Sequence, residues 1–517
     1  MSMTWLANVD RGTFWAHHAW SEFASLAAKD RSLVILPLYG FADHGLGLPL
    51  DAEEILGSAI IRHAVIQAGN VVPCLVLPSV RFGLAPYPSS FFGIDPETAH
   101  ALLHEIAAGV KAAGFTKLVF VNTSPWNREL VVDASRDIRV VQKLQTFIVN
   151  TPALGFDFHP ASDKRAQAQA AVSHLLGTPA RSSTRPADVR DGDYRPGCYL
   201  QPLPLAPDPS INGAAVINTA GQHLARLFAD IQARAPLGSS DHRTPATLPS
   251  LQNPENSFVF PERYRTRYLP ALTRDELSAI TNNDRALVII PTGAIEQHGH
   301  HLPVGVDSIL GQAWLENVLP RLAADAPVYV APPLTYGKSN EHLAFVGTLS
   351  ISVSTFRRLL LAVATQLKAL GFRQIAILNT HGGNSAVVVS TLREIQITLG
   401  LRAGLLGWPY KPELPAQEAA YGFHAGDWET SLMLAVADEL VTMSKSVCEY
   451  PAQLSDPGEL RPEDAPAIFS WATEDVSQSG VMGDATAATH ENGRRWLEAE
   501  SAALARRIEG LLSTRPN

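Results

Sequence analysis

Short apolar runs alternate with longer stretches of helical spacing along this chain. The run Ala286 to Pro291 is rich in β-branched residues and too short for a free-standing helix, so it predicts a buried strand. Apolar residues recur at helical spacing over 354–370 and end at Gly371, which predicts an amphipathic helix with a glycine stop. The same pattern predicts strands at 328–331, 374–379 and 401–406, and helices at 308–323, 385–399, 429–440 and 493–512. Alternating strands and helices imply an α/β fold with a mostly parallel sheet covered on both faces.

The chain also repeats itself. Residues 33–56 align with 287–310 without a gap, at an offset of 254, and ten of the 24 positions are identical. The alignment resumes at 118–123 against 375–380, and Phe158-His159 matches Phe423-His424. We interpret this pattern as a tandem duplication of one α/β domain.

The predicted organisation is therefore a first copy over residues 1–235, a linker over 236–262 and a second copy over 263–517. The linker is rich in Pro, Ser and Thr and has no apolar periodicity.

Polar residues follow the first strand of the second copy. Glu296 and His298 are two positions apart, so both side chains point to the same side of an extended segment. Asp307 follows nine residues after His298. Two carboxylates and an imidazole form a candidate ligand set for a divalent metal. The alternative for this stretch alone is a polar loop with surface histidines.

Two further clusters follow later strands of the second copy. His381 opens His-Gly-Gly-Asn directly after 374–379, and His424 opens His-Ala-Gly-Asp-Trp-Glu429 after the fourth strand. Taken singly, the first could be a glycine turn with an incidental histidine. The second could be a helix start, with Asp427 as its cap and Glu429 in the first turn. Because sites in such sheets form beyond the carboxyl ends of the strands, the convergence of these clusters favours a metal site.

The second copy resembles the creatininase (creatinine amidohydrolase) family. The matching patterns are Gly293-Ala-Ile-Glu-Gln-His-Gly with His301-Leu-Pro and Asp307, Asn379-Thr-His-Gly-Gly-Asn384, His424-Ala-Gly with Glu429-Thr-Ser, and Gly480-Val-Met-Gly-Asp-Ala-Thr. The resemblance covers essentially all of 263–512 and extends weakly to the first copy. It implies two tandem three-layer α/β/α domains and two divalent metal ions per chain, with zinc expected first and manganese or iron as alternatives. Members of the family hydrolyse C–N bonds in cyclic or linear amides.

The resemblance also implies roles for individual residues. Glu296 and His381 would bind one metal, His298 the other, and Asp307 both. Gly383 stands where creatininase itself has a glutamate, so Glu429 would supply the remaining ligand, and creatinine is not the expected substrate. His424 matches the family's catalytic histidine and would donate a proton to the leaving nitrogen.

Other positions of the second copy are less clearly assigned. Trp408 and Trp428 could wall the pocket or serve packing alone. His300 stands where many relatives have proline.

The first copy has lost most of this ligand set. By alignment Ala42 replaces Glu296, Ser124 replaces His381 and Lys164 replaces Glu429; only His44 and His159 persist, with Glu53 in place of Asp307. We therefore expect the first copy to be non-catalytic. We also expect it to pack against the second copy in the way that the two subunits of a dimer pack together.

Composition narrows the class of protein further. The net charge of −9 and the absence of a basic cluster argue against nucleic-acid binding. No apolar run reaches membrane-spanning length, and the N-terminus lacks the apolar segment of a signal peptide. The three cysteines form no CxxC pair. We expect a cytoplasmic homo-oligomer that acts on a small-molecule amide.

The predicted function is hydrolysis of an amide C–N bond, in a cyclic amide or a formamide-type small molecule, by a metal-activated hydroxide. One alternative is a metallopeptidase of the same family that acts at a peptide terminus. Another is a non-catalytic metal-binding scaffold, against which the complete ligand set of the second copy argues.

Overall fold

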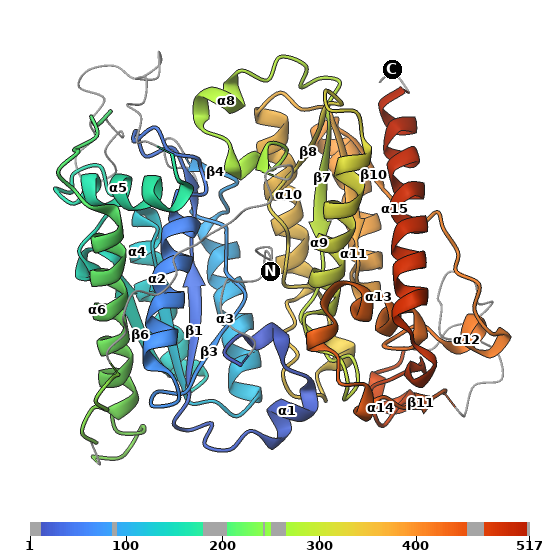
Figure 1. Cartoon of the computed structure of the whole chain (residues 1–517), viewed down its shortest axis with the longest axis horizontal. Helices are drawn as coiled ribbons and strands as arrows, with labels where there is room; N and C mark the ends of the chain where they lie inside the picture. Colours follow the sequence, from blue (N-terminus) through green and yellow to red (C-terminus); the bar gives the residue numbers. More distant parts are fainter. Residues whose placement is uncertain are drawn as a thin grey trace.

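A computed structural model describes residues 12–84, 90–178, 204–240, 243–249, 265–451 and 470–513. Two four-stranded parallel sheets lie side by side, one in each half of the chain (Figure 1). The first contains β1 (Leu33–Leu38), β3 (Cys74–Val76), β5 (Lys117–Asn122) and β6 (Gln145–Asn150). The second contains β7 (Leu287–Thr292), β8 (Val328–Val330), β9 (Gln374–Asn379) and β10 (Arg402–Leu405). The α/β class predicted from the sequence is confirmed.

The two sheets have the same topology. Their strand orders are β3-β1-β5-β6 and β8-β7-β9-β10, so each strand has a counterpart in the other sheet. The register also repeats, because Leu33 pairs with Lys117 as Leu287 pairs with Gln374. Strands β1 and β7 are buried along their whole length, which explains why they read as continuous apolar runs.

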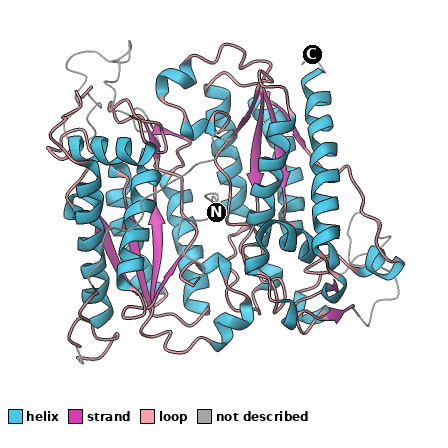
Figure 2. Ribbon diagram, in the orientation of Figure 1, coloured by secondary structure: helices cyan, strands magenta, loops and turns pink. Residues whose placement is uncertain are grey.

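Helices cover both faces of each sheet (Figure 2). In the first copy, α2 (Ala52–Ala68), α5 (Arg165–Leu176) and α6 (Gly213–Ala233) pack together, and α3 (Pro96–Ala112) packs on α4 (Arg128–Val141). Their counterparts in the second copy are α9 (Val306–Val318), α13 (Asp427–Ala437) and α15 (His490–Ser513), with α10 (Val353–Ala369) on α11 (Ser385–Glu394). Each copy therefore has the three-layer architecture that the family resemblance implied.

Several helix ends differ from the sequence-based expectation, and two of them show why. Helix α11 ends at Glu394, and Ile395–Leu399 forms a π-helical turn before the left-handed Gly400. Helix α13 begins at Asp427, and Gly426 at its N-cap provides no side chain to cap it. Asp427 therefore does not cap the helix, as one alternative for this cluster had it, and its carboxylate accepts a hydrogen bond from the Ser431 hydroxyl, 2.8 Å away.

The two copies meet across a seam with approximate twofold symmetry. The backbone N–H of Leu50 donates to Leu272 O at 3.0 Å, and that of Val304 donates to His18 O at 2.9 Å. All four positions are related by the offset of 254. A second pair repeats the relation, with Asp51 N–H to Pro270 O and Gly305 N–H to Ala16 O. Contacts that recur in both directions are those of an isologous dimer interface.

Helix α3 of the first copy packs against α10 of the second within this seam.

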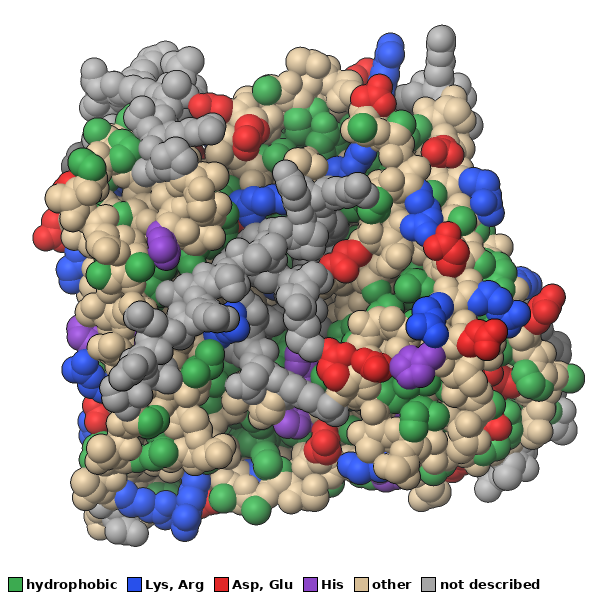
Figure 3. Space-filling model, viewed as in Figure 1, with side chains coloured by type: hydrophobic (Ala, Val, Ile, Leu, Met, Phe, Trp, Pro, Cys, Tyr) green, Lys and Arg blue, Asp and Glu red, His purple; other side chains and the backbone are tan. Residues whose placement is uncertain are grey.

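Part of the expected linker, residues 241–242 and 250–262, lies outside the described residues. On the face shown in Figure 3, acidic and basic side chains are interspersed over the second copy. No helix in the described part of the chain is long and apolar enough to cross a membrane.

Candidate metal centre

The candidate centre lies at the carboxyl ends of β7 and β9. Glu296 and His298 follow β7, Asp307 lies in the first turn of α9, and all three side chains are buried. Gly299 has φ +71°, a left-handed conformation that turns the chain after His298. The loop returns close to its start, because Glu296 N–H donates to Val304 O at 2.9 Å. This closed loop brings the side chains of Glu296, His298 and Asp307 close together.

His381 approaches the same carboxylates from β9. Its Nδ1 lies 3.1 Å from Glu296 Oε2 and 3.5 Å from Asp307 Oδ2. Its Nε2 lies 2.9 Å from the carbonyl oxygen of Lys338, which can only accept a hydrogen bond. Nε2 therefore carries the hydrogen, and the lone pair of Nδ1 faces the carboxylates, as in a metal-ligating histidine.

His298 faces the other oxygen of Asp307. Its Nε2 lies 3.5 Å from Asp307 Oδ1 and 3.8 Å from Glu429 Oε2. Its Nδ1 lies 3.1 Å from the carbonyl oxygen of Glu296, so Nδ1 carries the hydrogen and Nε2 is free to bind a cation. The two carboxylate oxygens of Asp307 thus face two different histidines.

Several buried atoms of this cluster make no hydrogen bond. They are His298 Nε2, Glu296 Oε2 and Asp307 Oδ2. Buried polar atoms are costly unless a hydrogen bond or a cation compensates them. The cluster contains several groups of three ligand atoms that lie within 4.8 Å of one another. Buried histidine and acidic clusters of this kind are consistent with a binuclear metal site.

The pKa values of these groups reflect their burial and mutual charge. Burial raises the pKa of Glu429 to about 7. Burial by itself lowers the pKa of His298, but the charges of Asp307 and Glu429 outweigh it and raise that pKa to about 9. Protons and divalent cations compete for the same lone pairs, so metal affinity should fall as pH falls.

His424 and His342 lie beside the candidate ligands and also belong to groups whose atoms are close enough to hold a metal. His424 Nδ1 is 3.8 Å from Glu296 Oε1, and His342 Nε2 is 3.5 Å from the same oxygen. The sequence analysis identified His424 but missed His342, which lies in the turn Asn340–His342 after β8 and is buried. No periodic pattern marks that turn, although the Glu-His pair at 341–342 is the kind of signal that could have been considered.

Glu341 accounts for Gly383. Glu341 Oε1 lies 3.7 Å from His381 Nε2, and its other oxygen pairs with Lys338 Nζ at 2.8 Å. A Cβ atom at position 383 would collide with the Glu341 carboxylate and with the His381 ring. Position 383 therefore has no room for a side chain in this arrangement.

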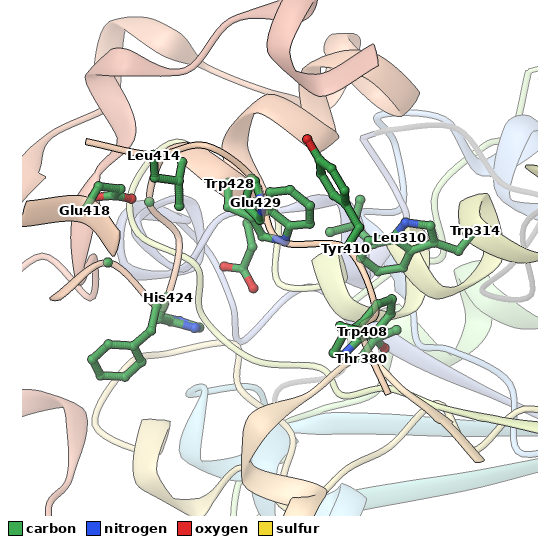
Figure 4. A pocket seen from close by; sticks show the side chains of 14 residues that line it. Leu310, Trp314, Thr380, Trp408, Tyr410, Leu414, Glu418, His424, Trp428 and Glu429 are labelled. Atoms are coloured by element: carbon green, nitrogen blue, oxygen red, sulfur yellow. The ribbon is translucent and has the colours of Figure 1, made fainter. Parts of the chain in front are cut away.

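A pocket of about 310 Å³ opens beside Glu429 and His424. Figure 4 shows the Glu429 carboxylate pointing into the space between His424 and the opposite wall, which carries Trp408 and Thr380. Trp408 and Trp428 both line it, as the sequence analysis considered. The remaining aromatic lining residues are Trp314, Tyr410 and Phe423. The pocket thus joins an apolar, aromatic wall to the candidate ligands.

The corresponding place in the first copy is built differently. His44 Nε2 lies 3.1 Å from Glu53 Oε1. Lys164, which aligns with Glu429, is a cation and donates its ammonium hydrogen to Pro152 O. Tyr39 fills the position of Gly293 and is buried. Among the described residues, the groups able to hold a metal lie at the second-copy centre and at a partly exposed cluster, His100, His104 and Asp137; none includes His44 or Glu53.

The fold and the site together describe an α/β protein with a buried candidate metal centre. The sequence model of the family "Creatininase: Creatinine amidohydrolase" matches residues 16–177 and 270–508, and the chain belongs to this family. The two matched regions start 254 residues apart, which is the offset of the internal repeat.

The named relatives match less than half of this chain and most of their own length. The chain is 33% identical over 211 residues to the mycofactocin precursor peptide peptidase of Mycolicibacterium smegmatis, covering 40% of this chain and 78% of that protein. It is 29% identical over 252 residues to the creatinine amidohydrolase of Pseudomonas putida, covering 45% and 92%. A solved manganese creatininase is 26% identical, with a TM-score of 0.41, over 48% of this chain and 99% of that one.

Proposed function

We propose that the second copy hydrolyses an amide C–N bond of a small molecule at a binuclear metal centre. The observation that carries the proposal is the position of Asp307, whose two oxygens each lie 3.5 Å from a different histidine nitrogen. A carboxylate placed in this way can bridge two cations.

The other ligands divide between the two positions. Glu296 and His381 belong to one side, because Glu296 Oε2 is 3.1 Å from His381 Nδ1. His298 and Glu429 belong to the other, with 3.8 Å between Nε2 and Oε2. Two divalent ions bound there would polarise the substrate carbonyl and lower the pKa of a water molecule. Zinc is the expected metal, with manganese or iron as alternatives, because the ligands are imidazoles and carboxylates.

His424 can transfer the proton that the reaction needs. Its Nε2 lies 2.8 Å from the carbonyl oxygen of Gln297, so Nε2 carries a hydrogen and Nδ1 faces the ligand cluster. Burial lowers the pKa of His424 well below its ordinary value. The ring is therefore neutral, and Nδ1 can take a proton from the attacking water and deliver it to the leaving nitrogen.

The aromatic pocket supports a small substrate. Its volume of about 310 Å³ is at the lower end of ligand sites, and indole and phenol rings form much of its wall. Such rings pack on the apolar or planar part of a ligand. They also exclude water from the reacting bond.

The test is an assay of the purified holoenzyme against a panel of small cyclic amides, linear amides and formamides. We expect turnover of at least one class, loss of activity with a chelator, and recovery on addition of zinc or manganese. Activity that is unaffected by complete metal removal would overturn the proposal.

A peptidase that acts at a peptide terminus is the second candidate function. It is favoured by the 33% identity to the mycofactocin precursor peptide peptidase and by the His-Gly-Gly-Asn pattern at 381–384. Peptides blocked at either terminus, assayed beside the amide panel, separate the two candidates. A higher kcat/KM for peptides would favour the peptidase.

A further inference from the structure

Residues near the start of the first copy lie against the loops that carry the metal ligands. The loop 296–305 is held by two backbone hydrogen bonds, from Val304 N–H to His18 O and from Gly305 N–H to Ala16 O, each 2.9 Å long. The indole N–H of Trp15 donates to Gly347 O at 2.9 Å. The first copy therefore forms part of the support of the second-copy site.

Trp20 extends this contact to a third segment of the second copy. It is the first residue of α1 (Trp20–Ser25), and its indole N–H donates to Ser479 O at 3.2 Å. Its ring packs on His300, with centroids 4.6 Å apart, and on Phe345 at 5.2 Å. This contact gives His300, which the sequence analysis left unassigned, an aromatic packing partner.

The segment that Trp20 contacts, residues 477–482, is clasped from its other side. The Glu449 carboxylate accepts hydrogen bonds from the backbone N–H groups of Gln478 at 2.7 Å and Ser479 at 2.9 Å. It also accepts one from the hydroxyl of Ser477 at 3.1 Å. The segment is thus fixed between an acidic side chain of its own copy and an indole of the other copy.

Segment 477–482 in turn holds His424. The backbone of Met482 pairs with that of His424 through two hydrogen bonds of 2.8 and 3.3 Å. Gly480 O accepts a hydrogen bond from the side-chain amide of Gln297 at 3.0 Å, and the carbonyl of Gln297 accepts from His424 Nε2. The backbone of His424 and the hydrogen-bond partner of its ring therefore both depend on where this segment lies.

The seam is asymmetric at this point. The counterpart of Trp20 is Arg274, the first residue of α8 (Arg274–Ser278), which lies 254 positions later. Arg274 approaches Asp43, the counterpart of Gln297, with 3.7 Å between Nη1 and Oδ2. The backbone contacts of the seam are the same in both directions, whereas the aromatic brace is present on the side that faces the candidate catalytic centre.

We infer that the first copy acts as a positioning subunit, in which Trp20 braces segment 477–482 and thereby orients His424 in the second copy. The inference rests on the proposed function for the role of His424. It gives the degenerate copy a task that does not require metal ligands of its own. Trp20 is a positioning residue, because it reaches His424 only through segment 477–482.

The test compares full-length Trp20→Phe and Trp20→Ala with Ser25→Ala as a matched control. Trp20→Phe keeps an aromatic ring and removes the indole N–H. The Ser25 hydroxyl donates within α1, to Ser21 O at 3.0 Å. We expect Trp20→Ala to lower kcat about 10- to 100-fold, the cost of a small misplacement of a catalytic group. Metal content and KM should stay near wild type, Trp20→Phe should fall between, and Ser25→Ala should match wild type.

A double-mutant cycle identifies the route of the effect. If Trp20 acts through His424, Trp20→Ala in a His424→Ala background should cause little further loss of kcat. Losses that multiply independently would overturn the inference, as would full activity of Trp20→Ala.

A readout that does not need activity separates this inference from the proposed function. Hydrogen exchange of residues 477–482, followed by mass spectrometry, should be at least about tenfold faster in Trp20→Ala than in Ser25→Ala, because the segment loses its brace. Unchanged exchange would overturn the positioning role even if the substrate is not an amide. Absence of amide turnover in the wild type, with faster exchange in the variant, would contradict only the proposed function.

Discussion

The imidazole rings of His342 and His424 lie stacked, with centroids 4.5 Å apart and planes 27° from parallel. The side-chain amide of Gln297 orders His342, because Gln297 Oε1 accepts the Gly299 N–H at 2.8 Å and its Nε2 then faces His342 Nδ1 at 3.0 Å. The Thr473 hydroxyl lies 2.7 Å from the same nitrogen. The His342 ring is thus fixed in orientation, and the ring of His424, the candidate proton-transfer group, packs against it.

His342→Gln should therefore lower kcat by about tenfold or more, because His424 loses the ring that fixes its orientation. Metal content should stay near wild type, since His342 Nε2 faces a single oxygen of the candidate ligands, Glu296 Oε1, at 3.5 Å. Steady-state kinetics and elemental analysis check both points. Loss of metal together with activity would show instead that His342 is a ligand.

Glu296→Ala and Asp307→Ala should abolish metal binding and hydrolysis while circular dichroism shows an intact fold. Each change removes a carboxylate that faces at least one histidine nitrogen in the cluster. Glu316→Ala is a matched control, because Glu316 lies on the same helix as Asp307 and outside the cluster. Full activity in either cluster variant would contradict the metal assignment.

His424→Ala should lower kcat strongly while metal content stays near wild type. A proton-transfer group is needed only as bonds to the reacting carbon form and break, so its loss should not affect a ground-state metal site. Metal analysis of the purified variant beside its kinetics decides the matter. Simultaneous loss of metal would assign His424 as a ligand.

Tightly bound metal should amount to two ions per chain, because the buried candidate ligand groups lie in the second copy. His44→Ala and Glu53→Ala should leave both metal content and kcat nearly unchanged. Elemental analysis after extensive dialysis tests this, since dialysis removes ions held weakly at the partly exposed His100, His104 and Asp137 cluster. Four tightly bound ions, or loss of metal on changing His44, would show that the first copy holds a working site.

Glu500 should make stability depend on pH. It is fully buried, accepts a hydrogen bond from Tyr410 N–H at 3.1 Å, and burial raises its pKa from 4.5 to about 7. Between these values the folded chain keeps a proton that the unfolded chain has lost, so the free energy of unfolding falls as pH rises from about 4.5 to about 7.

Glu500→Gln should therefore have a higher Tm than wild type at pH 8 and a similar Tm near pH 4. Glu509→Gln, an exposed change on the same helix, is the control and should follow wild type at both values. Thermal unfolding followed by circular dichroism measures the difference. A Glu500→Gln variant that is less stable than wild type at pH 8 would contradict the argument.

Much of the fold could be read from the sequence because its strands are buried on both faces. Such strands appear as uninterrupted apolar runs, as at Leu287 to Ile290, and the internal repeat showed that the pattern occurs twice. The candidate ligands could be read as well, because parallel strands bring their carboxyl ends to one edge and the polar residues there must converge. The domain limits at 235 and 263 and the separate roles of the ligands stay predictions.

Only the tertiary structure brought His342 and Glu341 to the site and Trp20 to a segment that packs against it. The first two lie in an irregular turn after β8, where no periodicity indicates the direction of a side chain. Trp20 lies 459 residues from Ser479 in the chain, and the contact exists only because two copies pack across a seam. Sequence patterns report local burial and spacing, whereas the packing of remote segments depends on shapes that form after the chain has folded. The sequence by itself therefore determined the two copies, their strands and the types of the candidate ligands, and only the tertiary structure decided which segments of the two copies pack against one another around the candidate site.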